Sequence, residues 1–556
     1  MVLSPDEKTH ETMGDTENID IILIASSEIT NASTKDALSL DRLELFRNLV
    51  FPNMVHHEGT FRTQIDLLNR LYHGLYYSEA GFEQRRNMMN VWNLPSFGGI
   101  YLAGFLEAYG LRCGVINNLE SEWDRFCAMY GNGNTPLVGI STTFHLGWAP
   151  VQRVAKKLRT IDASMRLLVG GALMPTLAMG EPPETWEASL RRAGCEAALF
   201  AMNSEHDLLE YVRAGKDDSA RAAVPNLAWF DTDGVYRINK TAWHEPLTDA
   251  FPVNWAGLDL PFVNRTFQMR TVVGCPFACR FCSYPVLSRG LRCIDMDQVE
   301  KMVNEICRIE SLRQLIVLDD TANIPRDRFI HFCKLMRKND LSWYCFLRPQ
   351  FVDGYIAELM RDSGCEAVSL GVESGNDGIL KNMNKMTTAS EMANGIAHLH
   401  KAGIATAAFF IIGFPGETEG TVRETERFIT GAGIDYYMLK DFFYIPSTGV
   451  DDIAAEYGLE GYQHVWKHAT MDSVEASRLK ESLYREMSSV THLDSNTGMW
   501  QLAVMKDAGM TREEILTAQR LMNGIIKDQM TGAFSDSHPA FASLGETLSV
   551  ARKRNG

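Results

Sequence analysis

Short apolar stretches alternate with amphipathic segments along two long parts of the chain, and this alternation restricts the fold more than any other feature. In the first part the apolar stretches are IDIILIAS (19–26), CGVIN (113–117), PLVGIS (136–141) and RLLVGG (166–171). Between two of them, FGGIYLAGFLEAYG (97–110) is typical of a helix that ends at Gly110. Strands separated by helices form parallel sheets covered on both faces. The sequence therefore predicts a doubly wound, Rossmann-like α/β domain.

A second series begins near residue 267. Its apolar stretches are FQMRTVV (267–273), RQLIVLDD (313–320), SWYCFLR (342–348), AVSLGVES (367–374), ATAAFFIIG (405–413) and YYMLKDFFYI (436–445). Segments with helical spacing separate them, such as the one with Val299, Met302, Val303 and Ile306 on one face. Six such units predict a (βα)6 partial TIM barrel, whose functional residues lie at the carboxyl ends of the strands.

These two series divide the chain into five expected parts. They are a polar tail (1–18), the Rossmann-like domain (19–239), a proline-containing linker (240–266), the barrel (267–445) and a helical C-terminal region (446–556). The formal net charge of −16 argues against a nucleic-acid-binding surface, which needs clustered lysine and arginine. No apolar run is long enough for a membrane span, and the polar N-terminus does not resemble a signal peptide. We therefore expect a cytoplasmic protein with reduced thiols, and neither a nucleic-acid nor a membrane partner.

Three cysteines, Cys275, Cys279 and Cys282, lie within eight residues directly after the first strand of the second series. The packing of three unrelated core residues does not account for them, because cysteines rarely crowd a turn for packing alone. Zinc would require paired C-x2-C units and a fourth ligand, and the next cysteine, Cys293, has no partner nearby. Thiolates in one short loop suit an iron–sulfur cluster, and three of them leave one iron of a cubane open.

The spacing C-x3-C-x-aromatic-C, with Phe281 as the aromatic residue, resembles the motif of radical S-adenosylmethionine (SAM) enzymes. The segments LGVESGNDGILKNMNK (370–385) and FFIIGFPGETEGT (409–421) are similar to the fourth-strand and fifth-strand segments of that family. The resemblance implies a 4Fe-4S cluster on the three cysteines and SAM on its open iron. One-electron reduction of SAM would then give a 5′-deoxyadenosyl radical.

The same resemblance implies the SAM-binding residues. They are Phe281, Asp320, Glu373, Ser374, Gly413 and Pro415. Glu373 and Ser374 would face the ribose or the amino group, while Gly413 and Pro415 would bring the backbone close to the adenine. Where many members have Gly-Gly-Glu, this chain has LDDTAN (318–323). Asp320, or its neighbour Asp319, would therefore bind the SAM amino group.

A Rossmann-like domain before a radical SAM barrel resembles the cobalamin-binding class of this family. The small residues at its strand ends are Ser141, Thr142, Gly170 and Gly171, and they would let a flat corrin lie on the sheet edge. The D-x-H-x-x-G motif is missing, so we do not expect His145 to ligate cobalt in that way. The alternative is a domain that binds a nucleotide or nothing, although the absence of G-x-G-x-x-G from 137–174 argues against NAD.

This class implies a methyltransferase that moves a methyl group from SAM through cobalamin to an unactivated carbon or phosphorus of a small molecule. Residues 90–106 and 444–473 are most similar to the P-methyltransferases of phosphinothricin-type antibiotic biosynthesis. Arg348 and Lys440 would then provide positive charge for a phosphinate, with pairing to barrel carboxylates as the alternative.

Two other functions stay open. A radical SAM enzyme of this architecture can catalyse a rearrangement or C–S bond formation without methyl transfer. A non-enzymatic iron–sulfur protein would act as an electron carrier. Either enzymatic interpretation requires an external one-electron reductant of the flavodoxin or ferredoxin type.

Overall fold

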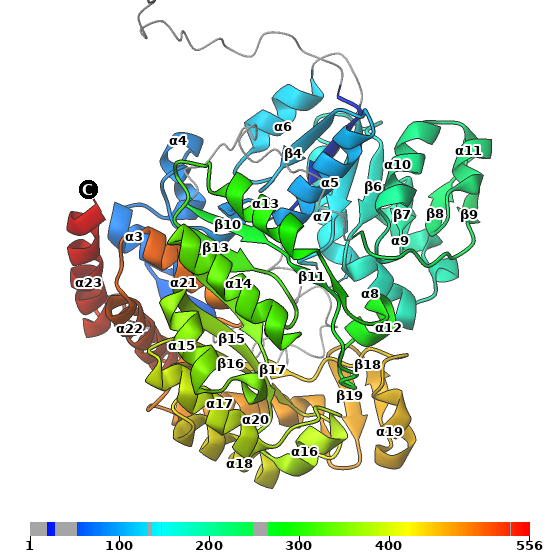
Figure 1. The fold of residues 1–556 in the computed structure, drawn as a ribbon. Helices are drawn as coiled ribbons and strands as arrows, with labels where there is room; N and C mark the ends of the chain where they lie inside the picture. Colours follow the sequence, from blue (N-terminus) through cyan, green and yellow to red (C-terminus); the bar gives the residue numbers. More distant parts are fainter. Residues whose placement is uncertain are drawn as a thin grey trace, which may run out of the picture.

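The computed structural model describes residues 19–27, 53–131, 136–145, 147–247, 265–533 and 535–555. The predicted polar tail (1–18) and residues 248–264 of the predicted linker lie outside this set. Two seven-stranded sheets form the centres of two α/β units (Figure 1). The predicted fold class, a doubly wound domain followed by a partial barrel, is confirmed. None of the described helices combines the length and apolar character that crossing a membrane requires.

The first unit is an open sheet with the strand order β4-β1-β5-β6-β7-β8-β9. Its strands are β1 (Ile21–Ile24), β4 (Cys113–Ile116), β5 (Leu137–Ser141), β6 (Leu167–Gly170), β7 (Ala197–Leu199), β8 (Leu227–Phe230) and β9 (Tyr236–Ile238). The strands from β4 to β7 are parallel, while β8 and β9 are antiparallel additions at one edge.

Helices cover both faces of this sheet, as the alternation of strands and helices predicts. They are α5 (Phe97–Ala108), α6 (Trp123–Tyr130), α7 (Trp148–Leu158), α8 (Leu173–Gly180), α9 (Glu187–Ala193) and α10 (Glu205–Ala214). Successive residues of β1 point to opposite faces. Ile22 and Ile24 pack in the hydrophobic cluster that contains α6 to α9, whereas Ile21 and Leu23 pack in the cluster that contains α5 and α10.

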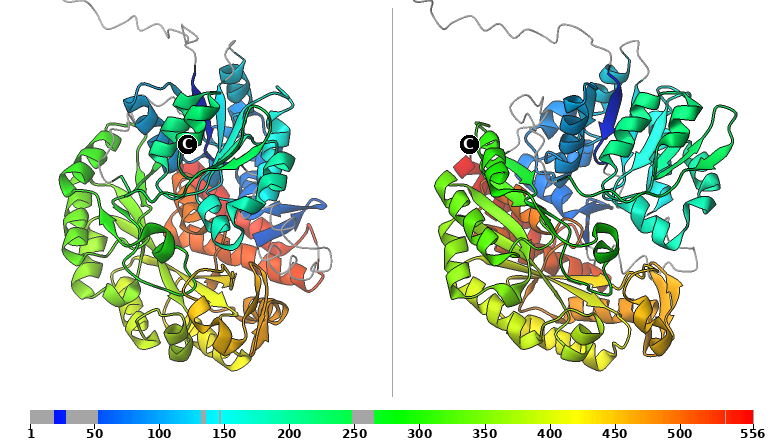
Figure 2. Two further views of the ribbon diagram at one scale, coloured as in Figure 1. Left: turned by 90° about the vertical axis from the view of Figure 1, so that its right-hand side faces the viewer. Right: turned by 45° about the vertical axis from the view of Figure 1, so that its right-hand side comes forward.

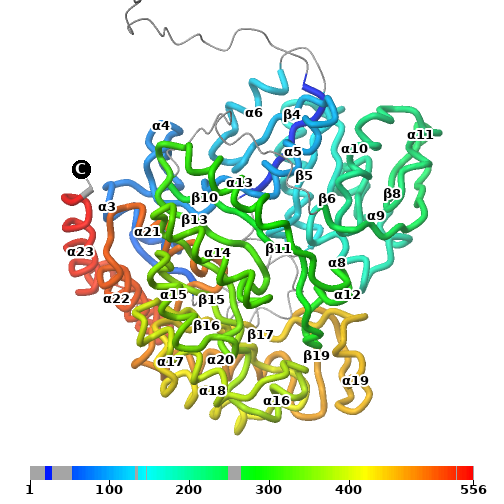
Figure 3. The backbone as a smooth tube through the Cα atoms, in the orientation of Figure 1, coloured from blue at the N-terminus to red at the C-terminus, as the bar shows by residue number. Residues whose placement is uncertain are grey.

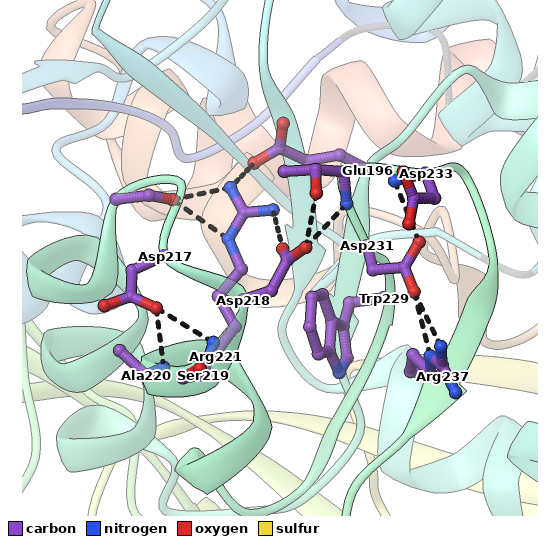
Figure 4. Close-up of polar contacts among 12 residues, drawn as sticks. Glu196, Asp217, Asp218, Ser219, Ala220, Arg221, Trp229, Asp231, Asp233 and Arg237 are labelled. Carbon is purple, nitrogen blue, oxygen red and sulfur yellow. Dashed lines mark hydrogen bonds and ion pairs between the residues drawn. The ribbon is translucent and has the colours of Figure 1, made fainter.

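A cluster of charged side chains fastens the two antiparallel strands at the amino end of β7 (Figure 4). Arg221 of α11 (Asp218–Ala223) lies 3.5 Å from Glu196, and its Nε donates to the carbonyl of Gly215 at 2.9 Å. Arg237 Nε donates to Asp231 Oδ2 at 3.0 Å. Ligands of parallel sheets bind at the carboxyl ends of the strands, so we interpret this cluster as structural.

The second unit contains all six predicted barrel strands and a short seventh strand. They are β10 (Thr266–Met269), β13 (Gln314–Val317), β14 (Ser342–Leu347), β15 (Cys365–Glu373), β16 (Ala405–Ile412), β17 (Tyr436–Asp441) and β21 (Thr491–His492), paired in that order and all parallel. The helices that cover the outer face include α13 (Met296–Ile306), α14 (Arg326–Asn339), α15 (Gly354–Asp362), α17 (Ala389–Lys401), α18 (Glu419–Gly431) and α20 (Ser473–Glu486).

The inner face of the barrel packs against chain segments from both ends of the sequence. On β17, Tyr437 and Leu439 belong to the outer hydrophobic cluster, while Tyr436 and Met438 belong to the inner one. The inner cluster also contains the helices α21 (Gly498–Asp507), α22 (Arg512–Met530), α23 (Pro539–Asn555) and α3 (Gln64–His73). Figure 3 shows the C-terminal helix α23 beside α3, although the two helices are far apart in the sequence.

The C-terminal region is mainly helical, as predicted, but it also contains a small sheet that the sequence pattern did not reveal. This antiparallel sheet consists of β18 (Glu460–Tyr462), β19 (Val465–His468) and β20 (Met471–Asp472). Strands this short contain too few residues for an alternation of apolar and polar side chains to be recognised. The right-hand view of Figure 2 shows it below the first domain, and Ser447 Oγ donates to the carbonyl of Met179 at 3.2 Å. The small sheet therefore lies beside the contact between the two units.

Candidate active site

The three clustered cysteines lie at the carboxyl end of the first barrel strand, where the sequence places them. The chain leaves β10, forms β11 (Val272–Val273), and returns through α12 (Tyr284–Ser288) and β12 (Arg292–Cys293). Strands β11 and β12 pair antiparallel and close the base of the loop. The loop therefore holds its cysteines at the end of the barrel where residues of such folds perform chemistry.

All three loop cysteines are free thiols; Cys279 is buried, and Cys275 and Cys282 are half-buried. Burial, together with the neighbouring Cys279 and Cys275, raises the pKa of Cys282 to about 12. Among the described residues, no three His, Cys, Asp or Glu side chains converge closely enough for one metal ion. Three thiols from one loop fit an iron–sulfur cluster, whose iron would favour the thiolate forms.

Arg348, at the end of β14, contacts this loop rather than an open substrate site. Its Nη2 donates to Cys279 Sγ at 2.7 Å, and its Nη1 donates to the carbonyl of Lys385 at 2.9 Å. The guanidinium also lies 3.6 Å from the centre of the Phe277 ring. The sequence predicts Arg348 either to bind a phosphinate or to pair with a carboxylate of the barrel. The observed contacts match neither expectation. The guanidinium instead donates a charge-assisted hydrogen bond to the sulfur of Cys279.

The two aspartates after β13 have different environments. Asp319 accepts hydrogen bonds from the backbone N–H groups of Thr271 and Val272, at 2.6 and 3.0 Å, and from the Thr271 hydroxyl. Its carboxylate therefore holds the turn between β10 and β11. Among the described residues, no side chain donates to the Asp320 carboxylate, and burial together with the nearby charge of Asp319 raises its pKa to about 7. Of the two aspartates, only Asp320 is available to a ligand.

Glu373 ends β15 with a φ of 74°, a backbone conformation that a glutamate rarely adopts. Its Oε1 accepts from Lys385 Nζ at 3.0 Å, and the same ammonium lies 5.8 Å from the centre of the Phe281 ring. Glu373 and Phe281, both predicted SAM residues, are therefore linked through Lys385. No local pattern in the sequence points to Lys385, because an exposed loop lysine would have the same neighbours in the chain.

The remaining predicted SAM residues have structural contacts. The fully buried Ser374 lies with its Oγ 3.3 Å from the Thr425 hydroxyl and accepts from the Asn376 N–H. Gly413 has a φ of 95°, and a Cβ there would lie 2.4 Å from the Trp466 ring. The carbonyl of Pro415 accepts from the Asn382 side chain at 3.1 Å. The glycine is thus required by close packing, whatever its role toward a ligand.

A cavity of about 240 Å³ lies between the first domain and the barrel. From the first domain it is lined by Thr143, His145, Ala172, Leu173, Thr176 and Leu177, and from the second unit by Ser283, Phe443, Ile445, Tyr462 and Gln463. The first group follows β5 and β6, at the carboxyl edge that the sequence singled out. The second group includes the residue directly after Cys282, so the cavity reaches the cysteine loop.

The four predicted small residues form the edge beside this cavity without lining it. Ser141 and Gly170 are aligned partners on β5 and β6. Thr142 Oγ1 donates to the carbonyl of Gly170 at 2.7 Å. Gly171 has a φ of 98°, and a Cβ there would lie 2.8 Å from the Thr142 nitrogen. These residues therefore let β5 and β6 end close together, and the cavity opens immediately beyond them.

His145 is a polar residue of the cavity with a ring nitrogen that is not hydrogen-bonded. It is buried, and its Nδ1 has no hydrogen-bond partner among the described residues. Burial lowers its pKa to about 4, so the ring is neutral near pH 7 and can donate or accept one hydrogen bond at this atom. An orphaned ring nitrogen, apolar walls and a sheet edge fit a large flat group with polar substituents at its rim, such as a corrin.

The family comparison identifies the barrel. Residues 269–429 match the model of the Radical SAM superfamily. This part of the chain is a radical SAM domain. The match contains the cysteine loop, Asp320, Glu373 and the Gly413 segment, so the predicted cluster and SAM residues all lie within the radical SAM domain.

Relatives of the chain include methyltransferases. It is 29% identical over 396 residues to an uncharacterized methyltransferase of Pyrococcus horikoshii, covering 68% of this chain and 83% of the relative. It is 27% identical to the anaerobic magnesium-protoporphyrin IX monomethyl ester cyclase of Rubrivivax gelatinosus, covering 60% and 62% of the two chains. It is 28% identical to the bacteriochlorophyllide d C-12(1)-methyltransferase of Chlorobaculum tepidum, covering 37% and 47%.

Solved structures of cobalamin-dependent enzymes share the fold of nearly the whole chain. The radical SAM methyltransferase TsrM from Kitasatospora setae, with cobalamin and a [4Fe-4S] cluster bound, has a TM-score of 0.57 at 15% identity, covering 83% of this chain and 96% of TsrM. The cobalamin-dependent enzyme OxsB, with aqua-cobalamin and SAM bound, has a TM-score of 0.54 at 12% identity, covering 97% and 84%. The Rossmann-like domain, the radical SAM domain and their arrangement are therefore shared with these proteins.

The contact between Arg348 and Cys279 predicts an effect on the redox properties of the radical SAM domain. A positive donor on a cluster sulfur favours the reduced cluster, so Arg348→Met should lower the reduction potential. A lost stabilisation of ~1.4 kcal/mol corresponds to about 60 mV for one electron. Titration of the anaerobic protein, followed by electron paramagnetic resonance, measures this shift. Arg326→Met is the control, since that exposed arginine pairs with Asp353, and an equal potential in both variants would contradict the prediction.

Proposed function

We propose that this chain is a cobalamin-dependent radical SAM methyltransferase that acts on a small molecule. The observation that carries the proposal is the cavity between the two units, because it joins the carboxyl edge of the Rossmann-like sheet to Ser283 in the cysteine loop. A methyl donor on the sheet edge and a radical source on the loop would then serve one substrate. The methyltransferases among the relatives, and the cobalamin bound in TsrM and OxsB, support it.

The residues of the chain have distinct roles in this proposal. Cys275, Cys279 and Cys282 would hold the cluster, and the Arg348 guanidinium donates a hydrogen bond to Cys279 Sγ. Asp320 would accept a hydrogen bond from the SAM amino group. When bound, the cluster and SAM supply a radical that removes a hydrogen atom, and cobalamin supplies the methyl group. An external one-electron reductant of the flavodoxin or ferredoxin type would reduce the cluster.

The residues around the cavity would position the corrin and exclude water. His145 would hydrogen-bond to a polar group at the corrin rim, and Leu173 and Leu177 present apolar surface from α8. On the other wall, Phe443 and Ile445 follow β17 and face the same space. The substrate would therefore lie between the corrin and the end of the barrel, shielded from solvent on both sides.

A finer form of the proposal concerns the methylated atom. The similarity of residues 90–106 and 444–473 to P-methyltransferases of phosphinothricin-type pathways supports methylation of a phosphinate phosphorus in antibiotic biosynthesis. Methylation of an unactivated carbon is the alternative within the same chemistry. In both cases the hydrogen atom removed by the radical leaves an open valence that accepts the methyl group.

A single-turnover experiment tests the proposal without knowledge of the substrate. Protein purified anaerobically from cells supplied with cobalamin should show corrin absorbance beside that of the cluster. After reduction and addition of SAM, we expect S-adenosylhomocysteine in an amount equal to the bound cobalamin, together with 5′-deoxyadenosine. 5′-Deoxyadenosine alone would support a rearrangement or C–S bond formation instead. Absence of both products would overturn the proposal in favour of an electron carrier.

A further inference from the structure

One side of the cysteine loop carries apolar side chains that reach the surface. Phe277 of this loop is half-buried and stacks on Phe351, with the ring centres 5.8 Å apart and the planes 20° from parallel. Phe351 ends η7 (Pro349–Phe351), the short turn after β14, and is 37% exposed. Ala278, the next residue of the cysteine loop, is also exposed. Apolar surface is therefore present on the loop that would hold the cluster.

A third chain segment adds Met386 to this side of the loop. The Asn384 side chain donates to the carbonyl of Ala278 at 2.8 Å, and Arg348 Nη1 donates to the carbonyl of Lys385 at 2.9 Å. These two bonds hold the segment against the cysteine loop. Met386 follows with a φ of 56° and is 74% exposed. We call the following four residues the loop patch: Phe277, Ala278, Phe351 and Met386.

The loop patch is connected to a cysteine sulfur by direct side-chain contacts. The Arg348 guanidinium lies 3.6 Å from the centre of the Phe277 ring. The same guanidinium donates to Cys279 Sγ at 2.7 Å. A continuous series of contacts therefore runs from Phe351 through Phe277 and Arg348 to a predicted ligand of the cluster.

The loop patch is separate from the cavity between the two units. None of its four residues lines that cavity, which the cysteine loop reaches at Ser283. An exposed apolar patch with polar surroundings commonly marks a surface that contacts another molecule. One part of the loop thus faces the proposed substrate space, and another part faces solvent.

The charge around the loop patch differs from that of the whole chain, whose formal net charge is −16. Three segments meet at the patch and contain no aspartate or glutamate: 275–282, 348–352 and 381–388. Their cations are Arg280, Arg348, Lys381 and Lys385. Arg280 lies 3.9 Å from Asp452, whereas the exposed Lys381 of α16 (Asp377–Asn382) forms no ion pair among the described residues. Such a surface is complementary to an acidic partner.

We propose that the loop patch is the docking surface for an acidic flavodoxin-type protein that reduces the cluster. The proposal rests on the cluster of the proposed function and names the surface at which the external reductant binds. One electron would pass from the flavin hydroquinone anion to the cluster and leave a neutral flavin semiquinone, with no bond broken and no proton transferred. Electron transfer slows steeply with distance, so contacts that lead from the surface to Cys279 favour this side of the loop.

The test compares reduced flavodoxin with dithionite as reductants of the anaerobic, cobalamin-loaded, cluster-containing protein. Rapid-freeze electron paramagnetic resonance counts the reduced cluster with time. Phe351→Glu and Met386→Glu each place a negative charge on the loop patch. We expect each to slow reduction by flavodoxin about tenfold or more, because electrostatic complementarity acts mainly on the rate of association. Reduction by dithionite should keep its wild-type rate, since so small a reductant requires no docking surface.

Phe61→Glu is the matched control. Phe61 lies on β3 (Thr60–Thr63), outside the loop patch, and is 42% exposed, so the change in ring and charge is the same as at Phe351. Both reductants should act on this variant at the wild-type rate. Iron content establishes that each variant retains its cluster. If Phe351→Glu does not fold, Met386→Glu replaces it, because the side chain at this position is almost fully in solvent.

The salt dependence of the rate provides a second readout. The Debye length falls from about 10 Å at 0.1 M salt to about 3 Å at 1 M, so added salt should slow reduction by flavodoxin. Lys381→Gln removes one exposed cation beside the loop patch and should make this dependence weaker. A structural role of the lysine would not change the response to salt.

Four outcomes would overturn the inference. They are a wild type that dithionite reduces but flavodoxin does not, patch variants that flavodoxin reduces at the wild-type rate, equal slowing in the Phe61→Glu protein, and a flavodoxin rate that is independent of salt. Failure of the proposed function is recognised separately. It appears either as a protein without cluster absorbance, which dithionite cannot reduce, or as absent S-adenosylhomocysteine in a protein whose cluster is reduced normally.

Discussion

Cys279→Ala should abolish the formation of 5′-deoxyadenosine from SAM by the reduced protein, and Cys275→Ala and Cys282→Ala should do the same. Each change removes one of the three thiolates that a cluster on this loop requires. Removing a residue that only supports a metal ligand commonly lowers metal affinity or activity by 10–100-fold. Removing a ligand itself should therefore lower the rate of SAM cleavage by more than about a hundredfold. Chromatography of anaerobic reactions, with iron and sulfide analysis of each protein, measures both effects.

Cys293→Ala is the matched control for these variants. Cys293 lies on β12, at the base of the same loop, but it is exposed and belongs to no predicted ligand set. We expect its cluster content and SAM cleavage to equal those of the wild type. A Cys279→Ala protein that still cleaves SAM would contradict the assignment of the cluster to this loop. A loss of activity in the Cys293→Ala protein would show that the loop is sensitive to any change.

Ala172→Trp should remove cobalamin from the protein while leaving the cluster in place. Ala172 directly follows the edge of β6, lines the cavity and is exposed, so an indole there fills the cavity without disturbing the packed core. We expect the bound cobalamin to fall by about tenfold or more, since an indole at this position would occupy the space beside the strand edge that a corrin would need. The ratio of corrin absorbance to iron content in protein purified with cobalamin measures the change.

Ala188→Trp provides the control for this substitution. Ala188 is an exposed alanine of α9 in the same domain and does not line the cavity. Its replacement should leave the cobalamin content at the wild-type level. Full cobalamin content in the Ala172→Trp protein would place the corrin elsewhere. It would also remove the observation on which the proposed methyl transfer depends.

The sequence predicts the fold well because periodicity is a local property. Strands β10 and β13 to β17 coincide with the apolar stretches seen in the sequence, since buried parallel strands need continuous apolar residues. The small sheet β18–β20 was missed, because strands of two to four residues show no period. This sheet nevertheless contributes Tyr462 to the wall of the cavity.

The site residues were predicted unevenly for a related reason. The spacing of Cys275, Cys279 and Cys282 is a local pattern, and a loop with that spacing can be recognised without coordinates. Arg348 shows the opposite case. Its charge suggested a substrate contact, but the guanidinium lies on Cys279, which is 69 residues away in the sequence. No local pattern carries such a contact.

The sequence by itself determined the two α/β units, the loop that carries the three cysteines, and the strand edge next to the cavity. These features follow from the order and spacing of residues close together in the chain. Only the tertiary structure decided that Asp319 holds a turn while Asp320 stays available, and that the buried ring nitrogens of His464 have no partner among the described residues. The physical reason is that pairing and burial depend on which distant segments meet when the chain folds.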